Sequence, residues 1–318
     1  MIANLPLMHR PGVIVSLDDE PIFHRLLSRI LPAGSTVEFF NEPDSFVARM
    51  QVEVFKQAED LVHQSKLIEQ WRQGEYLIPT VLRYWAEHPE RHALVRTCLV
   101  DYMMPGTTGL DVLQSISTWK GGRVLMTAHA DEQIAVTAFN EGLIDQFIPK
   151  QRLSADIGAL PVLLGRAASI SSSVYGSLWA AQIKPDQQDL LQAYGEKLAH
   201  FARHHWVEYV VLGDPFGILG LDACGRAWWL QLEDSTHLGD LAELAESVEV
   251  PAAVLSEIRA GKQFAAVELQ DQLRAGSREV QLAPTIDIGD DGILLGALFA
   301  ISPDDLPYPI PDFTSREK

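Results

Sequence analysis

The stretch "LVDYMMPGTTGLDVL" at residues 99–113 decides the fold. A run of strand-forming residues, "VRTCLVD" at 95–101, ends there in the bare carboxylate of Asp101, and the turn-forming residues Pro105 and Gly106 follow. A buried strand needs apolar residues and a turn needs proline or glycine, but neither needs a carboxylate at the carboxyl end of the strand. Taken alone, Asp101 is interpreted equally well as a turn residue and as a functional group.

Short apolar runs alternate with helical patterns on both sides of this stretch. They predict five strands, at 12–17, 35–40, 95–100, 122–127 and 144–149. Strands that alternate with helices form a parallel sheet with helices on both faces. The first half of the chain is therefore predicted to be α/β, with a doubly wound five-stranded parallel sheet. Ligands of such sheets bind beyond the carboxyl ends of the strands.

Five polar residues lie at that edge of the predicted sheet: Asp18, Asp19, Asp101, Thr127 and Lys150. Three neighbouring carboxylates repel one another and need a cation, and Mg²⁺ suits them because it prefers oxygen ligands. A lysine and a hydroxyl beside them would cradle a phosphoryl group, whose charge must be neutralised during transfer. A carboxylate can itself be the nucleophile and form an aspartyl phosphate. Together the five residues favour the functional interpretation of Asp101.

Four segments resemble the receiver domain of two-component response regulators. They are "IVSLDDEP" at 14–21, "LVDYMMPGTTGLDVL" at 99–113, "LMTAHAD" at 125–131 and "EGLIDQFIPK" at 141–150. The resemblance covers residues 10–168 and implies the flavodoxin-like fold of that family. It also implies that a histidine kinase or a phosphotransfer protein donates a phosphoryl group to the chain. The only catalysis implied is phosphorylation and dephosphorylation of the chain's own aspartate, since no separate catalytic domain is recognised.

The family's metal-binding and acceptor roles carry over to matching positions of this sequence. The resemblance implies that Asp101 is the phosphoacceptor. It implies that Asp19 and Asp101 bind Mg²⁺ directly, together with the backbone carbonyl of Met103. Asp18 would act on the metal largely through water.

The resemblance also implies residues for phosphoryl binding and for switching. Lys150 would pair with the phosphoryl oxygens, and Thr127 would donate a hydrogen bond to one of them. Phe147 would turn inward as Thr127 moves. The chain departs from the family after the lysine, where Gln151 replaces the usual proline and Pro149 precedes it instead. The geometry of this loop is therefore left open.

A second departure is the length of the connection between the second and third strands. About 55 residues lie there, where a crossover needs only about a dozen. Their pattern is helical, so we predict a helical insertion at about 45–92, an extended helix packed on a hairpin partner at 78–88. Whether the insertion controls access for a kinase or only extends the core stays open.

The second half of the chain predicts a different organisation. Residues 169–205 are expected to form a linker and a connecting helix, and residues 304–318 a tail. Between them, at 206–303, strands grouped around a helical middle predict a smaller antiparallel α+β domain. Its order of elements resembles that of PAS domains, which sense small ligands or mediate dimerisation. The connecting helix carries an apolar seam that is typical of a helix with a helical partner.

Charge and composition limit the expected partners. The net charge is −18, and residues 206–318 hold 20 acidic against 7 basic side chains, so we expect no nucleic-acid partner. No apolar run reaches the roughly 18 residues of a membrane span, and the start of the chain lacks the pattern of a secretory signal. The two cysteines, Cys98 and Cys224, cannot build a disulfide framework, which favours the cytoplasm.

The leading hypothesis is a cytoplasmic response regulator whose C-terminal domain binds a downstream protein or senses a ligand. One alternative is a receiver-controlled enzyme with an unrecognised C-terminal catalytic domain. Another is a transcriptional regulator with an atypical DNA-binding domain, which the acidic second half disfavours. A phosphatase-like hydrolase is disfavoured because Met103 stands where a general-acid aspartate would be needed. The cognate kinase, the pathway, the ligand, a homodimer and the effect of phosphorylation on oligomeric state stay open.

Overall fold

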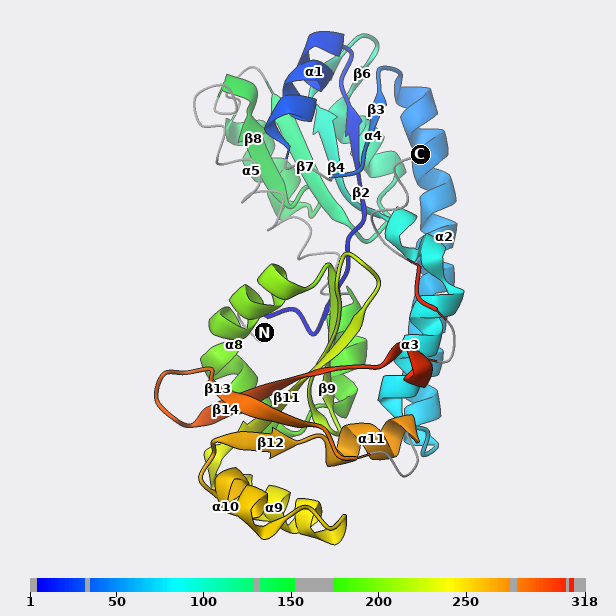
Figure 1. The fold of residues 1–318 in the computed structure, drawn as a ribbon. Helices are drawn as coiled ribbons and strands as arrows, with labels where there is room; N and C mark the ends of the chain where they lie inside the picture. The colour runs from blue at the N-terminus through cyan, green and yellow to red at the C-terminus, as the bar shows by residue number, and fades with distance from the viewer. Residues whose placement is uncertain are drawn as a thin grey trace. The chain divides into compact units, whose positions relative to one another are not determined.

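The computed structural model describes residues 5–31, 35–127, 132–151, 174–274, 279–306 and 309–311. The chain forms two compact units, both drawn in Figure 1. The parallel-sheet unit contains Pro11–His63 and Glu90–Tyr175, and the antiparallel-sheet unit contains Met1–Arg10, Gln64–Pro89 and Gly176–Lys318. The predicted domain end at 168, the start of the linker at 169 and most of the tail at 304–318 lie outside the described residues.

The parallel-sheet unit is built on five strands in the spatial order β3-β2-β4-β7-β8. They are β2 (Val13–Leu17), β3 (Val37–Phe40), β4 (Val95–Asp101), β7 (Gly122–Thr127) and β8 (Gln146–Pro149). All neighbouring strands run parallel. Because a parallel sheet is covered on both faces, every residue of β4 is buried. The sheet confirms the predicted fold class and the five predicted strands.

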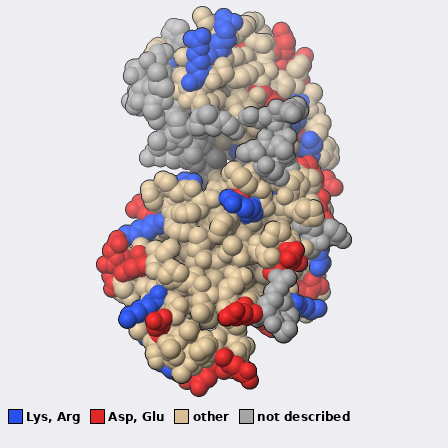
Figure 2. Space-filling model, in the orientation of Figure 1, with Lys and Arg blue, Asp and Glu red and all other residues tan. Residues whose placement is uncertain are grey.

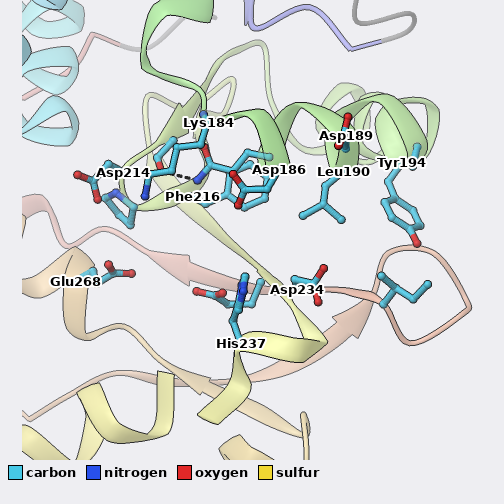
Figure 3. A pocket seen from close by; sticks show the side chains of 16 residues that line it. Lys184, Asp186, Asp189, Leu190, Tyr194, Asp214, Phe216, Asp234, His237 and Glu268 are labelled. Atoms are coloured by element: carbon cyan, nitrogen blue, oxygen red, sulfur yellow. Dashed lines mark hydrogen bonds between the residues drawn. The ribbon is translucent and has the colours of Figure 1, made fainter. Parts of the chain in front are cut away.

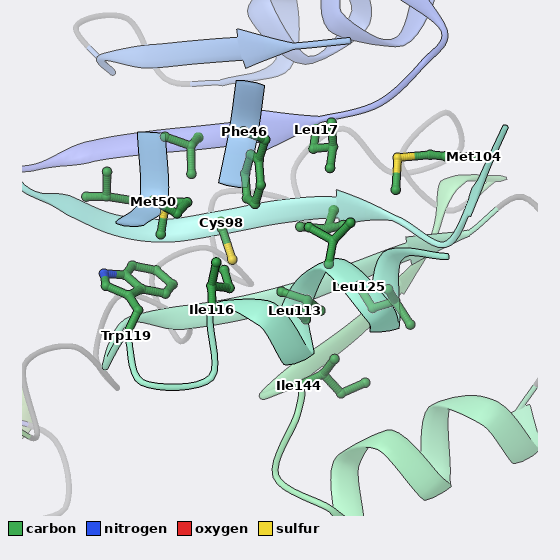
Figure 4. Close-up of a cluster of buried hydrophobic side chains, with 14 of the residues drawn as sticks. Leu17, Phe46, Met50, Cys98, Met104, Leu113, Ile116, Trp119, Leu125 and Ile144 are labelled. Carbon is green, nitrogen blue, oxygen red and sulfur yellow. The ribbon is translucent and has the colours of Figure 1, made fainter. Parts of the chain in front are cut away.

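Two clusters of buried apolar side chains cover the two faces of this sheet. Cys98 and Val100 of β4 belong to one cluster and Leu99 to the other, because successive side chains of a strand point to opposite faces. Figure 4 shows the first cluster. The helices that contribute side chains to the two clusters are α1 (Pro21–Ile30), α2 (Pro43–Arg72), α4 (Gly109–Ser115) and α5 (Glu132–Asn140). Of these, α1 covers one face and the other three cover the opposite face.

The predicted insertion is helical, but the inward side of its long helix α2 is partly polar. Glu53 is fully buried, and its carboxylate accepts hydrogen bonds from the backbone N–H of Val95 and from Arg49, both at 2.8 Å. The Gln57 side chain exchanges two hydrogen bonds with the backbone of Lys120. The helix is therefore anchored to the sheet by polar groups as well as by apolar packing.

The insertion contributes to both units. It continues from α2 into α3 (Leu77–Glu87) and the short 3-10 helix η1 (Pro89–Ala93). The residues of α2 as far as His63 belong to the parallel-sheet unit, whereas the later ones belong, with α3, to the antiparallel-sheet unit. There α3 contacts α11 (Val267–Leu273), whose Gln272 side chain accepts a hydrogen bond from the backbone N–H of Ile78.

The antiparallel-sheet unit contains seven strands in the spatial order β1-β9-β10-β11-β14-β13-β12. They are β1 (Met8–His9), β9 (Glu208–Gly213), β10 (Phe216–Leu221), β11 (Ala227–Asp234), β12 (Gln263–Ala265), β13 (Leu282–Asp287) and β14 (Leu294–Ala300). Every pair is antiparallel, as predicted. The sequence did not predict β1, which the start of the chain adds to the sheet. The resemblance to a PAS domain stays a prediction.

Besides α3 and the end of α2, this unit contains the helices α8 (Pro185–His205), α9 (Leu238–Ser247), α10 (Ala252–Arg259) and α11, with 3-10 turns η2 (Ala180–Gln182), η3 (Ser235–His237) and η4 (Pro303–Asp305). The apolar seam of α8, including Leu191, Tyr194 and Leu198, is buried within the chain, and α8 contacts β10. The expected helical partner is therefore not needed to cover this seam. None of the helices in the described part of the chain has the length and apolar character for crossing a bilayer.

Candidate functional site

The structure brings the predicted site residues together at the carboxyl ends of the parallel strands. Asp18 follows β2, Asp101 ends β4, Thr127 ends β7 and Lys150 follows β8. One carboxylate oxygen from each of Asp18, Asp19 and Asp101 lies within 4.8 Å of the other two. Among the described residues, no other group of three carboxylate, histidine or cysteine side chains is close enough to share a metal ion.

Lys150 closes this acidic cluster with two ion pairs. Its Nζ lies 2.7 Å from Oδ2 of Asp18 and 2.9 Å from Oδ1 of Asp101, and its side chain is only 12% exposed. Burial lowers the pKa of Lys150, but its hydrogen bonds to the two carboxylates outweigh burial, so the pKa lies above its ordinary value. Lys150 therefore carries its charge at neutral pH, as a group that neutralises phosphoryl oxygens must.

The surroundings of Asp101 disfavour its negative charge. Burial raises the pKa of Asp101, Lys150 lowers it, and the charges of Asp18 and Asp19 raise it again, so the pKa lies above its ordinary value. Three carboxylates face one ammonium group in this cluster. The negative charge of the cluster is therefore only partly compensated, and a further cation would balance it.

The donor atoms of the cluster fit a hard divalent cation such as Mg²⁺, because all of them are oxygens and the cluster has an excess of negative charge. Asp18 already uses Oδ1 to accept a hydrogen bond from the backbone N–H of Glu20 at 3.0 Å, and it uses Oδ2 to bind Lys150. Asp19 and Asp101 would then be the direct carboxylate ligands. This arrangement agrees with a role for Asp18 through water.

The turn after Asp101 is built by its own backbone. β5 (Met103–Met104) and β6 (Thr107–Thr108) pair as a short antiparallel hairpin. Gly109 then begins α4 so close to the sheet that a Cβ atom on it would lie 2.2 Å from the backbone oxygen of Asp101. The Thr108 side chain caps α4 by accepting a hydrogen bond from the backbone. The carboxylate of Asp101 takes no part in these hydrogen bonds, so the interpretation of Asp101 as a turn residue loses its support.

The remaining predicted residues surround the cluster. Thr127 is 3% exposed and pairs in register with Pro149, one residue before Lys150. Phe147 is half-buried and packs against the apolar cluster of Figure 4. Met103 begins β5, and its side chain is 64% exposed. Residues 128–131, which follow Thr127, lie outside the described part of the chain.

The sequence analysis missed one residue of the site, Phe23. It lies on α1 and is 5% exposed, and the Nζ of Lys150 lies 4.6 Å from the centroid of its ring. This is the geometry of a cation–π interaction. The apolar spacing of Phe23, Leu27 and Ile30 predicts a core-facing side of α1. It could not show that the first of these side chains reaches the lysine.

The antiparallel-sheet unit contains a second candidate site, a cavity of about 540 Å³ drawn in Figure 3. Its carboxylates come from α8, the β9–β10 turn, the end of β11 and α11, and are Asp186, Asp189, Asp214, Glu233, Asp234 and Glu268. Lys184 and His237 also line it. Burial, followed by the charge of Glu268, raises the pKa of Glu233 to about 8. Sequence reasoning did not find this cavity because its walls come from segments far apart in the chain.

Acidic side chains also gather on the surface of the antiparallel-sheet unit. Figure 2 shows them over α9 and α10 and over the loop between β13 and β14. That loop contains Asp290 and Asp291, and Asp287 ends β13 just before it. Part of the surplus of negative charge in the sequence therefore lies in these patches.

The chain is similar over nearly its whole length to the response regulator LqsR from Legionella pneumophila. The match covers 98% of this chain and 96% of LqsR, with a TM-score of 0.69 and 17% sequence identity. The chain therefore has the fold of a response regulator, with the parallel-sheet unit as its receiver fold. No family model and no curated protein matches the sequence.

Shorter structures match about half of the chain. One is the signal receiver domain of an HD domain-containing protein from Pseudomonas fluorescens Pf-5, with 19% identity, a TM-score of 0.32, and coverage of 52% of this chain and 91% of the other. Another is a CheY-like receiver domain protein from Methanospirillum hungatei JF-1, with 14% identity, a TM-score of 0.34, and coverage of 51% and 98%.

Proposed function

We propose that this chain is a response regulator of a two-component phosphorelay, in which Asp101 accepts a phosphoryl group from a histidine kinase or a phosphotransfer protein. The observation that carries the proposal is the buried cluster of Asp18, Asp19, Asp101 and Lys150 at the carboxyl edge of the parallel sheet. A fold shared with LqsR supports it. The proposed receiver domain spans residues 10–168, and its location is cytoplasmic.

The proposed chemistry follows from the groups at this edge. An Oδ atom of Asp101 attacks phosphorus, the bond from phosphorus to the donor nitrogen breaks, and the nitrogen keeps the electron pair. Asp19, Asp101 and the carbonyl of Met103 would hold Mg²⁺, with Asp18 acting through water, and the ion would neutralise charge on the phosphoryl oxygens. Lys150 exchanges a carboxylate partner for a phosphoryl oxygen. Hydrolysis of the aspartyl phosphate reverses the state.

The proposed switch lies on β7 and β8. Thr127 donates a hydrogen bond to a phosphoryl oxygen, and Phe147 turns inward as Thr127 moves. The half-buried position of Phe147 at the rim of the apolar cluster leaves it room for two arrangements. Phosphorylation is then a local change of charge that biases a two-state surface.

The proposed output belongs to the C-terminal part of the chain, as a PAS-like domain at 206–303 joined by a linker and connecting helix at 169–205. It binds a downstream protein or senses a ligand. The cavity of about 540 Å³ supports the ligand-sensing version, because small-molecule sites are concave and of this order of size. The acidic patches of Figure 2 make nucleic acid a poor candidate for the partner.

A receiver-controlled enzyme is the second candidate, and the same cavity favours it. Carboxyl groups with raised pKa values are typical of acid–base catalysts, and the pKa values of both Glu233 and Glu268 are raised, chiefly by burial. Turnover of a substrate that stops in Glu233→Gln would favour this candidate over a purely sensing role.

The decisive experiment is phosphorylation of the purified chain by acetyl phosphate, with and without Mg²⁺, followed by intact mass. We expect a Mg²⁺-dependent adduct that hydroxylamine removes, because an acyl phosphate reacts with this nucleophile. The adduct should be absent in Asp101→Asn and present in the control Asp44→Asn, which changes an exposed aspartate at the start of α2. An adduct of the same size on Asp101→Asn would contradict the proposal.

A further inference from the structure

Phe23 lies under the only ammonium group found in the acidic cluster among the described residues. The helix that carries it, α1, begins two residues after Asp19, and Pro21 occupies its first position. The ring also belongs to the buried apolar cluster that contains Leu27 and Ile148. Its centroid lies 4.6 Å from the Nζ of Lys150. The ring therefore faces the ammonium group and has little freedom to turn away from it.

We propose that Phe23 is a positioning residue for Lys150, and that it acts through the negative charge of its ring face. This inference rests on the proposed phosphoryl transfer to Asp101. A cation over an aromatic face is attracted by the ring quadrupole, and the attraction strengthens where water is excluded. Both partners are largely buried here, with Phe23 5% exposed and the Lys150 side chain 12% exposed. Phe23 is thus a third partner of Lys150, beside Asp18 and Asp101.

The ring differs from the two carboxylates because the reaction does not consume it. Asp101 becomes an acyl phosphate, and Asp18 would accept hydrogen bonds from water on a bound Mg²⁺ ion. Both ion pairs of Lys150, at 2.7 and 2.9 Å, must then loosen or change. The Phe23 ring stays in the apolar cluster of α1 throughout. It can therefore hold the ammonium group at the sheet edge while its oxygen partners are exchanged.

The test replaces Phe23 with mono-, di- and trifluorophenylalanine, which keep the shape of the ring and progressively weaken its quadrupole. We expect the rate of Mg²⁺-dependent phosphorylation to fall stepwise, by about 3- to 30-fold in total, the range that cation–π interactions span. Phe23→Leu should be phosphorylated as slowly as the trifluoro variant. Phe23→Tyr should be phosphorylated faster than Phe23→Leu, because it keeps an aromatic ring face. The same fluorinated series at Phe46 is the matched control, because this ring is equally buried but belongs to the other apolar cluster.

A spectroscopic measurement tests whether the Phe23 ring stays over the Lys150 ammonium group, first without Mg²⁺ and then in a mimic of the phosphorylated state. Protons of the Lys150 side chain near its nitrogen should be shifted upfield by the ring current of Phe23, and the shift should vanish in Phe23→Leu. The shift should persist when beryllium fluoride and Mg²⁺ are added to mimic the phosphorylated state. Loss of the shift on this addition would show that the ring does not hold the lysine through the exchange.

The two proposals fail in different ways. If the unmodified chain is not phosphorylated, the proposed function fails whatever Phe23 does. If the unmodified chain is phosphorylated and the fluorinated series shows one constant rate, the function stands and the role of the Phe23 ring face is overturned. A stepwise fall at Phe46 equal to that at Phe23 would also overturn it, because the effect would then come from packing.

Discussion

The Nζ of Lys150 lies 2.9 Å from Oδ1 of Asp101, so the proposed nucleophile is ion-paired before any phosphoryl donor arrives. The same ammonium group lies 2.7 Å from Oδ2 of Asp18. The Lys150 side chain thus links the carboxyl ends of β2 and β4. This shared contact makes Lys150 important for the stability of the unit as well as for its proposed chemistry.

Replacement of Lys150 by methionine should destabilise the chain by about 3 kcal/mol at pH 7.5, because it leaves buried carboxylates without their partner. Addition of Mg²⁺ should restore part of the loss, since the cation compensates the same carboxylates. Urea unfolding with and without Mg²⁺ measures both effects. Lys197→Met is the control, because the ion pair of Lys197 with Asp290 is exposed and such pairs contribute little. Equal losses in the two variants would contradict the prediction.

Replacement of Asp101 by asparagine should stabilise the chain without Mg²⁺ at pH 7.5, by about 1 kcal/mol, an ordinary size for a single substitution. The folded-state pKa of Asp101 lies above its unfolded value, chiefly because of burial. The contribution of Asp101 to the free energy of unfolding is therefore complete below its pKa in the unfolded chain. It is lost as the pH rises through its pKa in the folded chain. The gain from asparagine should accordingly be small at pH 4 and larger at pH 7.5. Urea unfolding at the two pH values measures this gain in the free energy of unfolding. A gain that shrinks as the pH rises would contradict the prediction.

Replacement of Gly109 by alanine should cost about 3 kcal/mol and slow phosphorylation, because the new Cβ would lie 2.2 Å from the backbone oxygen of Asp101 and backbone must move. Gly239→Ala is the matched control. No atom lies within 4 Å of its added Cβ, and alanine in the helix α9 should stabilise by about 0.5–1 kcal/mol. Thermal unfolding and the acetyl phosphate rate measure the two effects. A Gly109→Ala variant as fast and as stable as the unmodified chain would show that the α4 start is not fixed against the strand.

Replacement of Glu233 by glutamine should raise the melting temperature at pH 9 and leave it nearly unchanged at pH 4. Burial, with the charge of Glu268, raises the pKa of Glu233 to about 8 from its ordinary 4.5. The stability that this carboxyl contributes is thus complete below pH 4.5 and is lost as the pH rises through about 8. Differential scanning calorimetry at pH 4, 6 and 9 follows the change. Glu243→Gln, which changes an exposed carboxylate of α9, should show no such dependence.

The arrangement at the sheet edge could be predicted because it depends on few local rules. Each strand is a continuous apolar run, and the polar residue that ends it marks its carboxyl end. Asp18, Asp101, Thr127 and Lys150 therefore had to gather once the strands were known to be parallel. The prediction needed no side-chain geometry. It could therefore place these residues at one edge of the sheet but could not give the contacts between their side chains.

Other features could not be predicted because their cause lies in distant partners. The buried face of α2 is partly polar, and Glu53 is acceptable there only because the backbone N–H of Val95 and the side chain of Arg49 donate hydrogen bonds to it. A strand of two residues, β1, has no periodicity to detect and exists because β9 pairs with it. The position of Phe23 under Lys150 likewise depends on how α1 packs across the sheet.

The antiparallel-sheet unit is built from separate segments of the chain, and this limits how recombination can exchange it. The unit draws on three stretches, Met1–Arg10, Gln64–Pro89 and Gly176–Lys318, and the parallel-sheet unit fills the intervals between them. No single recombination point can therefore exchange the whole antiparallel-sheet unit for another. A chimaera joined near residue 168 would keep β1 and α3 but remove the β9 and α11 elements that they contact. We therefore expect recombination to exchange the two units only as one whole.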